Sequence, residues 1–261
     1  MSTLETGVMV QPMRSDASVA YLAARAAARE LLRLRSGLAA PDAKPDEIGR
    51  LGDLGSHGII SAVLMGSYPG DTILSEEAAD GPWPSNIDRL WIIDPLDGTR
   101  EFGEAARTDW AVHVALVRHG ELVLGVVALP GLDEVFTSAH PPVIRPPSRR
   151  LRMVVSRTRP PAVAGDVARL MDAEMIPMGS AGAKTMAVVL GDADIYLHGG
   201  GQHVWDSAAP VAVARAAGLH TSRLDGSALV YPGSSSWQPD LLVCRPELST
   251  RVLHALRTVT E

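Results

Sequence analysis

The stretch Trp91-Ile92-Ile93-Asp94-Pro95-Leu96-Asp97-Gly98-Thr99 joins an apolar run to two carboxylates. The apolar run has the character of a buried strand. Pro95 has no N–H to give to a sheet, so the sequence predicts that the strand ends at Asp94 in a sharp turn. Asp94, Asp97 and the Leu96 carbonyl between them then offer three oxygens from four residues. Oxygen ligands at this density suit Mg²⁺ and a phosphate that shares it.

The spacing of the two carboxylates narrows the chemistry. Directly after a buried strand, Asp94 and Asp97 repel one another unless a cation lies between them, so the pair predicts a metal site. Phosphatases with an aspartate nucleophile carry an Asp-x-Asp-Gly-Thr turn, whose carboxylates stand at positions i and i+2. Here the spacing is i, i+3 with a proline between, so no phosphoenzyme is expected. Direct attack by a metal-activated water is the better interpretation.

The composition is that of an ordinary globular protein, with 261 residues of which 46% are hydrophobic and 21% charged. A net charge of −6 disfavours binding to nucleic-acid polymers or anionic membranes, so an anionic substrate needs a local positive site such as bound metal ions. Cys244 is the single cysteine, which excludes an intrachain disulfide and agrees with a cytoplasmic location. We infer neither export nor a membrane span, since no signal sequence or long apolar run is recognised.

The first half of the chain mixes helical and strand patterns and is therefore interpreted as α+β. Its predicted elements are, in order, a helix over 16–38, a loop or short hairpin over 39–53 that Asp53 closes, a helix over 54–65, a strand over 72–74, a loop over 78–88, and an antiparallel hairpin over 110–129.

After a proline- and arginine-rich connector over 141–150, short apolar strands alternate with helical stretches, which is the signal of an α/β unit. The predicted strands cover 151–155, 193–197, 229–231 and 241–244, and the predicted helices cover 163–172, 181–190, 204–217 and 246–258. We therefore expect an α/β protein with two subdomains. An α+β subdomain over 1–140 would carry most of the metal site, and an α/β subdomain over 151–261 would carry substrate contacts and the last metal ligand.

Three acidic segments resemble the signature segments of the inositol monophosphatase superfamily. They are WIIDPLDGTREF (91–102), the preceding Ser75-Glu76-Glu77, and Val204-Trp205-Asp206-Ser207-Ala208-Ala209. The finer similarity is to the CysQ-type branch, the 3′(2′),5′-bisphosphate nucleotidases, through DGTREF, VSRTRPP, GSAGAKTMAVVLGDADIYLH and SRLDG. The resemblance covers roughly residues 16–258 and implies a layered α-β-α-β-α sandwich.

Carried over position by position, the resemblance assigns the metal ligands. It implies two or three Mg²⁺ ions, held by Glu76, Asp94, the Leu96 carbonyl, Asp97 and Asp206. Asp206 lies far along the chain from the other four, so only folding would unite them.

The resemblance also assigns catalytic roles. The backbone of Gly98 and Thr99, at the start of a helix, would hold the scissile phosphate. The Thr99 hydroxyl, with Asp53 behind it, would orient and deprotonate the attacking water, and Glu76 is counted as catalytic through its metal. Around Asp53 the chain departs from the family pattern. Gly52, Gly55 and Gly58 predict a loose and mobile loop there.

Substrate contacts are implied at positions farther along the chain. Arg100 follows the acidic turn directly, and Asp206 is counted as a substrate contact as well as a metal ligand. In Ser156-Arg157-Thr158-Arg159 the two arginines suit a second phosphate, although a solvated basic turn is the alternative.

The segment around Gly179 and Ser180, with Lys184 one turn on, resembles the family's segment for the sugar and adenine. The alternative is an ordinary helix cap with a surface lysine. Tyr196 and Trp205 are candidates for contact with a base, and a core position is the alternative for both.

The resemblance implies Mg²⁺-dependent hydrolysis of the 3′-phosphate of 3′-phosphoadenosine 5′-phosphate to AMP, a role in sulfur metabolism, and sensitivity to Li⁺. The same metal chemistry would serve inositol monophosphate or fructose 1,6-bisphosphate. A non-catalytic cation-binding module is the lower alternative. The expected partner is a small bisphosphate nucleotide rather than a nucleic-acid polymer or a membrane, and a homodimer is compatible with the sequence.

Overall fold

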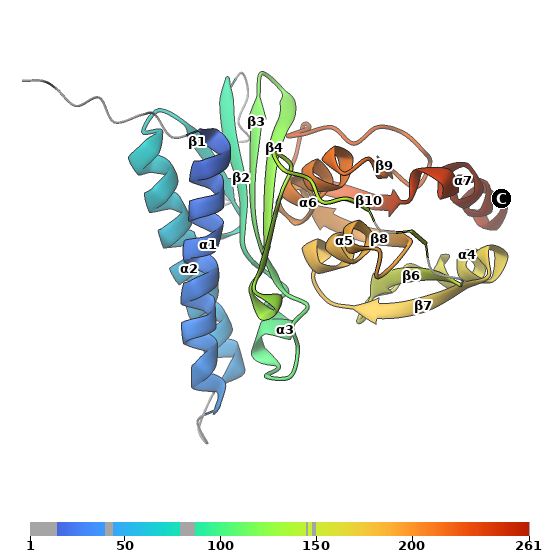
Figure 1. The fold of residues 1–261 in the computed structure, drawn as a ribbon, viewed down its shortest axis with the longest axis horizontal. Coiled ribbons are helices and arrows are strands. Elements are labelled where there is room, and N and C mark those ends of the chain that lie inside the picture. Colours follow the sequence, from blue (N-terminus) through green and yellow to red (C-terminus); the bar gives the residue numbers. More distant parts are fainter. Residues whose placement is uncertain (1–14, 40–43, 79–86, 145, 148–149, 261) are drawn as a thin grey trace, which may run out of the picture.

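The computed structural model describes residues 15–39, 44–78, 87–144, 146–147 and 150–260. Over these ranges the chain forms two five-stranded sheets, with helices outside and between them, so that the layers follow the order α-β-α-β-α (Figure 1). The layered α/β prediction is confirmed. Most of the predicted 78–88 loop and part of the 141–150 connector lie outside the described residues. None of the described helices is long and apolar enough to cross a membrane.

The first outer layer is a pair of helices, α1 (Asp16–Arg35) and α2 (Pro45–Ser67). Helix α1 begins after Ser15, whose hydroxyl oxygen accepts a hydrogen bond from the Ser18 N–H at 3.2 Å. Its alanine-rich face and Leu31 are buried against α2 and the first sheet, together with Ile60 of α2. The helix predicted over 16–38 is therefore confirmed, with its last turn a short 3₁₀ segment over Ser36–Ala39.

Helix α2 contradicts the predicted loop over 39–53, because it begins at Pro45 and contains Asp53. Proline is tolerated in the first turn of a helix, where its missing N–H would have no partner. Gly52 is buried where α2 packs closely, and a Cβ there would lie 3.1 Å from Leu96 Cδ2 and 3.3 Å from Phe102 Cε1. This glycine therefore serves a helix contact, and the prediction of a loose loop around Asp53 is wrong.

The first sheet has the strand order β1-β2-β3-β4-β5. Strand β1 runs parallel to β2 and the other neighbours are antiparallel, so the hairpin predicted over 110–129 is confirmed as β3 and β4. The strands are β1 (Thr72–Ser75), β2 (Arg89–Asp97), β3 (Ala111–Arg118), β4 (Glu121–Leu129) and β5 (Glu134–Thr137), and the short helix α3 (Thr99–Gly103) follows β2.

Strand β2 does not stop at Asp94, as its proline predicted, but runs to Asp97. The register with β3 shifts between Asp94 and Asp97, so Pro95 lies in an irregularity of the ladder. The prediction of a strand end at Asp94 is wrong. The shift keeps both carboxylates at the end of one buried strand.

The second sheet has the order β7-β6-β8-β10-β9. Its strands are β6 (Leu151–Ser156), β7 (Ala173–Met178), β8 (Ile195–His203), β9 (His220–Ser222) and β10 (Trp237–Cys244), and the helices of this half are α4 (Ala164–Met171), α5 (Ala181–Leu190), α6 (Val204–Ala216) and α7 (Ser249–Thr260). The predicted strand over 229–231 is wrong. The sheet edge is formed instead by β9, which pairs with β10.

The middle layer, α5 and α6, joins the two halves. One hydrophobic core contains Ile92 and Val127 of the first sheet together with Val154 of the second sheet and Ala187 and Ala208 of this layer. Figure 1 shows α5 and α6 between the two sheets. This shared core places the start of both helices beside the end of β2. The division into subdomains at 1–140 and 151–261 stays a prediction.

Candidate active site

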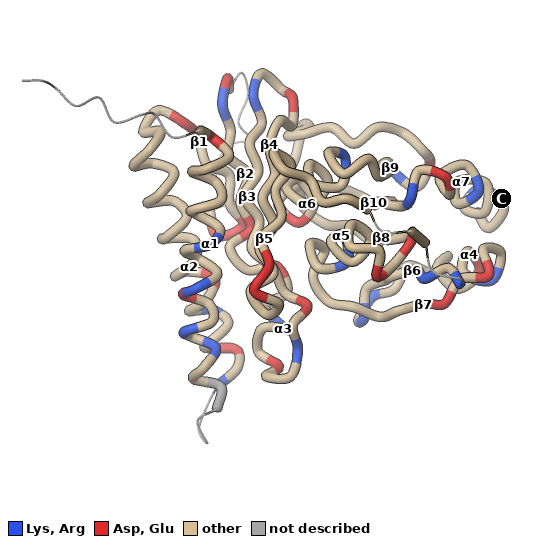
Figure 2. The backbone as a smooth tube through the Cα atoms, in the orientation of Figure 1, with Lys and Arg blue, Asp and Glu red and all other residues tan. Residues whose placement is uncertain are grey.

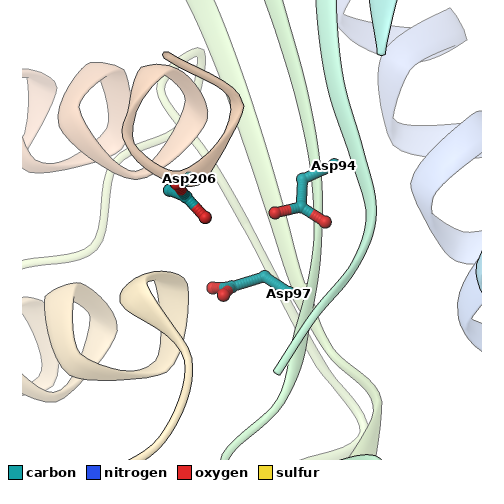
Figure 3. Close-up of side chains that lie close together, drawn as sticks. All are labelled: Asp94, Asp97 and Asp206. Carbon is teal, nitrogen blue, oxygen red and sulfur yellow. The ribbon is translucent and has the colours of Figure 1, made fainter. Parts of the chain in front are cut away.

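Three aspartates from two distant parts of the chain meet where the first sheet faces α6. Asp94 and Asp97 lie at the end of β2 and Asp206 in the first turn of α6, and one carboxylate oxygen from each lies within 4.8 Å of the others. Figure 3 shows these side chains converging, and Figure 2 shows how the acidic and basic residues are distributed along the whole backbone. Such an arrangement can hold a divalent cation.

The electrostatics of the cluster fit a cation. Asp94 is 1% exposed, and its Oδ2 has no hydrogen-bond partner among the described residues. Burial and the neighbouring charge of Asp97 raise the pKa of Asp94 well above its ordinary value, and the same two causes raise the pKa of Asp206. Buried carboxylates that repel one another need a positive partner to stay ionised.

The second half of the chain fixes the orientation of Asp97. Its Oδ2 accepts hydrogen bonds from the Ser180 hydroxyl at 2.5 Å and from the Gly182 N–H at 2.7 Å. Ser180 also caps α5, since its oxygen accepts from the Ala183 N–H at 3.0 Å. Ser180, predicted as a substrate contact, thus positions a carboxylate of the cluster. Asp206 is fixed by the His203 N–H, which donates to Asp206 Oδ2 at 2.5 Å.

The other two predicted ligands lie beside the cluster. Glu76 follows β1 and lines a cavity beside the cluster, which is described below. Burial and the charge of Asp206 raise its pKa. The Leu96 side chain is in the core, and its carbonyl accepts the Thr99 hydroxyl at 3.2 Å. The geometry thus brings Glu76, Asp94, Asp97 and Asp206 to one region, although Glu76 stands outside the tight group of three.

The predicted catalytic pair is in contact. The Thr99 hydroxyl lies 3.4 Å from Asp53 Oδ1, and Thr99 is exposed at the start of α3. Gly98, which precedes it, has φ +91°, a left-handed conformation that glycine adopts without strain. Burial, together with the charge of Glu77, raises the pKa of Asp53 to about 7. A carboxylate with this pKa can accept a proton near neutral pH.

A cavity of about 750 Å³ opens beside the acidic cluster. The predicted substrate residues from Gly98 to Arg100, at Ser156, Arg157 and Arg159, and at Gly179, Ser180, Lys184 and Asp206 all line it. The structure therefore brings together positions from β2, α3, β6, α5 and α6. Four of these residues are cations, and their surroundings differ: Arg100, Arg157, Arg159 and Lys184.

Arg157 already has partners in the protein. Its guanidinium donates to Glu101 at 2.7 and 3.1 Å and to Glu104 at 2.7 and 3.3 Å, which ties the end of β6 to α3. Arg159 is exposed, and among the described contacts only its backbone N–H is bonded, to the Ser156 hydroxyl at 3.1 Å. Burial and the charge of Asp97 raise the pKa of Asp206, and the positive charge of Arg159 makes that rise smaller.

Lys184 is not a surface lysine. It is 5% exposed, and its Nζ donates to the carbonyls of Ser180 at 2.6 Å and Gly179 at 3.1 Å. Burial lowers its pKa to about 8. The ammonium therefore fixes the loop before α5 and places positive charge at the cavity. Trp205 lines the cavity as well, and Tyr196 is fully buried beside it.

Sequence reasoning missed several residues of the site. His113 is fully buried, with Nδ1 3.0 Å from the Trp205 carbonyl and Nε2 3.4 Å from Asp97 Oδ2. His198, Gln202 and Trp237 line the cavity. A lone histidine in an apolar strand and a tryptophan after a serine run carry no pattern that could have identified them.

Comparison with known proteins places this geometry in a family. Residues 13–261 match the model of the inositol monophosphatase family, and the chain belongs to that family. It is 46% identical over 224 residues to a 3′-phosphoadenosine 5′-phosphate phosphatase of Mycobacterium bovis, an alignment that covers 82% of this chain and 83% of the relative.

Two further relatives agree. A 3′(2′),5′-bisphosphate nucleotidase CysQ of Escherichia coli is 31% identical over 199 residues, which cover 71% of this chain and 80% of the relative. The crystal structure of CysQ from Bacteroides thetaiotaomicron superposes with a TM-score of 0.75 at 25% identity, over 88% of this chain and 97% of that one. The fold and the family predicted from the sequence are confirmed.

Proposed function

We propose that the protein hydrolyses the 3′-phosphate of 3′-phosphoadenosine 5′-phosphate to AMP and inorganic phosphate, with two or three Mg²⁺ ions. The observation that carries the proposal is one cavity lined by Asp97 and Asp206 of the acidic cluster, by Glu76, and by Arg100 and Arg159, cations with no described carboxylate partner. A bisphosphate nucleotide needs both kinds of group, because one phosphate must reach the metal and the other must find a cation. The named relatives support the same substrate.

The cluster residues would hold the metal. Asp94, Asp97, Asp206 and Glu76 supply carboxylates and Leu96 a carbonyl, all hard oxygen ligands of the kind Mg²⁺ prefers. Bound Mg²⁺ would neutralise phosphoryl oxygens and lower the pKa of a water. Asp97 needs no rearrangement for this role, since Ser180 and Gly182 hold its side chain.

Thr99 and Asp53 would prepare the attacking water. The hydroxyl has one proton, and either the Leu96 carbonyl at 3.2 Å or Asp53 at 3.4 Å can accept it; when it donates to Asp53, its oxygen can accept a hydrogen bond from the water. In the reaction the water oxygen bonds to phosphorus, the bond between phosphorus and the 3′-oxygen breaks, and the leaving 3′-oxygen takes a proton from a second, solvent water to become the 3′-hydroxyl. Asp53 accepts the proton that the water loses.

The cations divide into two roles. Arg159 and Arg100 would bind the second phosphate, because no described carboxylate holds them, whereas Arg157 is shared between Glu101 and Glu104. Lys184 adds charge at the cavity and keeps the loop that contains Ser180 in place. The substrate would thus be held at one end by metal and at the other by arginine.

The test is a parallel assay of 3′-phosphoadenosine 5′-phosphate, inositol monophosphate and fructose 1,6-bisphosphate with Mg²⁺. We expect the highest kcat/KM for the nucleotide. A clear preference for either of the other two would contradict the proposal. Metal binding by folded protein without turnover of any of the three would favour a non-catalytic cation-binding module.

A further inference from the structure

Trp237 is the largest exposed apolar side chain at the cavity. It is the first residue of β10, it is 54% exposed, and it lines the same cavity as Asp97 and Asp206. A single exposed apolar residue is ordinary in a globular protein. The surroundings of this one show that its position is fixed.

The backbone of β8 is shaped around the indole. Gly201 has φ +87°, and a Cβ built there would fall 1.6 Å from Cη2 and 2.2 Å from Cζ2 of Trp237. The six-membered ring of the indole therefore rests directly on the glycine backbone. Any larger residue at position 201 would displace it. Because Trp237 also pairs with His203 across the two strands, the ring is held from its own strand and from the neighbouring one.

Trp237 continues a row of aromatic rings that starts at the metal site. The His203 ring stacks on Trp205, with 4.6 Å between the ring centroids and 6° between the planes. Trp237 meets His203 edge to face, with 6.0 Å between the ring centroids. The Ser236 hydroxyl lies 3.1 Å from His203 Nδ1. Trp205 directly precedes Asp206 and is buried. This aromatic wall (Trp205, His203 and Trp237) thus extends from the acidic cluster to an exposed indole.

We propose that Trp237 is the surface on which the purine base of the substrate stacks, and that it selects nucleotides over polyol and sugar phosphates. This inference rests on the proposed function. The cluster and the arginines account for two phosphates, and neither explains a fixed indole open to the same cavity. A purine has a flat π face that stacks on tryptophan, whereas inositol and fructose offer only hydroxyls and C–H groups.

The test compares substrates with and without a base in three proteins: wild type, Trp237→Leu and Trp237→Phe. The base-free probe is ribose 3,5-bisphosphate, which keeps both phosphates. For Trp237→Leu we expect KM for 3′-phosphoadenosine 5′-phosphate to rise roughly tenfold, with KM for the base-free probe nearly unchanged. Trp237→Phe keeps an aromatic face and is expected to recover most of the loss. An equal rise for both substrates would reduce Trp237 to a structural role and overturn the inference.

Tryptophan fluorescence gives a readout that needs no turnover. Titration with AMP is expected to quench the emission of wild type, and the quenching is expected to be largely lost in Trp237→Phe while AMP still binds as a competitive inhibitor. Unchanged quenching in that variant would overturn the inference. If wild type fails to hydrolyse the nucleotide but AMP still quenches Trp237, the proposed function fails and base stacking stands. If wild type is active and Trp237→Leu keeps its KM, only the inference fails.

Discussion

The protein holds its carboxylates in two different ways. Between α1 and β2, Arg89 donates to Asp16 at 2.9 and 3.1 Å and to Asp71 at 2.9 and 3.0 Å, and the indole N–H of Trp91 donates to Asp71 at 2.7 Å. At the other end of β2, Asp94 keeps an oxygen that no described group satisfies.

The pKa values follow the difference. The hydrogen bond from Arg89 lowers the pKa of Asp16, whereas burial and the charge of Asp97 raise the pKa of Asp94. Asp16 and Asp71, which have a cation partner, hold the outer helix layer to the sheet, whereas Asp94, which has no arginine or lysine partner among the described residues, belongs to the acidic cluster. The arginines divide in the same way, because Arg157 has two carboxylate partners and Arg159 has none among the described residues.

The largest expected effect is that of Asp94→Asn. Removing one ligand charge from the cluster should lower kcat at least about 1,000-fold, since metal contributes several kcal/mol to phosphoryl transfer. Without metal, the variant should be more stable than wild type, because wild-type Asp94 must either keep a buried charge beside Asp97 or take up a proton on folding, and asparagine does neither. Metal-dependent phosphatase assays and thermal unfolding with chelator measure the two effects.

Asp71→Asn is the matched control for that experiment. It removes a carboxylate that Arg89 and Trp91 both contact, so it should lower the free energy of unfolding by about 1–3 kcal/mol and leave kcat within about twofold. Full metal-dependent activity in Asp94→Asn would refute the assignment of the cluster.

The next effect separates the two arginines. Arg159→Ala should raise KM for 3′-phosphoadenosine 5′-phosphate by roughly 10- to 100-fold, because a charge-assisted contact to the second phosphate is lost. For 3′-AMP, which lacks that phosphate, KM should change little. Steady-state kinetics with both substrates measures the difference.

Arg157→Ala is the control, and it should lower the melting temperature by breaking the link between β6 and α3. Any change in KM should be similar for 3′-phosphoadenosine 5′-phosphate and for 3′-AMP. If Arg157→Ala rather than Arg159→Ala raises KM only for the bisphosphate, the division of the cations is wrong.

Metal should stabilise the protein through the same unsatisfied carboxylates. Mg²⁺ at 100 times its dissociation constant adds about 2.7 kcal/mol to the free energy of unfolding, which is roughly 5–11 °C in melting temperature for a chain of this size. Thermal unfolding with Mg²⁺ and with chelator measures the shift. In Asp94→Asn the shift should be much smaller. An equal shift in that variant would place the metal elsewhere.

Site residues that are adjacent in the sequence could be predicted from it, whereas those brought together only by folding could not. Asp94, Leu96, Asp97, Gly98 and Thr99 are consecutive or nearly so, and their spacing alone indicated metal. The layered fold followed from periodicity and from the family resemblance, and the structure confirms it. Asp206 could be added only through the resemblance, because the contact that unites it with β2 forms across the middle layer.

The errors have physical causes in tertiary packing. Pro95 predicted the end of a strand, but it lies at a register shift and β2 continues past it. Gly52 predicted a loop, but it is buried in α2, where its lack of a side chain permits close packing. The partners of Arg157 and the indole of Trp237 depend on α3 and β8, which are distant in sequence. No spacing rule connects these positions.

The smallest expected effect is the pH dependence of the unfolding free energy that Asp16, a carboxylate hydrogen-bonded by Arg89, contributes. Because Arg89 hydrogen-bonds the ionised form, Asp16 has a lowered pKa in the folded protein, and its contribution is present above its ordinary pKa. Asp16→Asn should therefore cost about 1 kcal/mol of unfolding free energy at pH 7. The cost should shrink as the pH falls below about 4 and disappear below the lowered pKa of folded Asp16, where the folded wild type also loses the charge. Urea unfolding at several pH values measures it.

Asp53→Asn should show the opposite dependence in metal-free protein. Burial raises the pKa of Asp53 to about 7, so in wild type the folded state holds a proton that the unfolded state releases. The stability of wild type relative to this variant should therefore decrease as the pH rises from about 4 to about 7. If both variants showed the same sign, the distinction between satisfied and unsatisfied carboxylates would not describe this protein. Opposite signs would show that one chain uses ionised carboxylates to stabilise its outer layer and bears their cost only at the site.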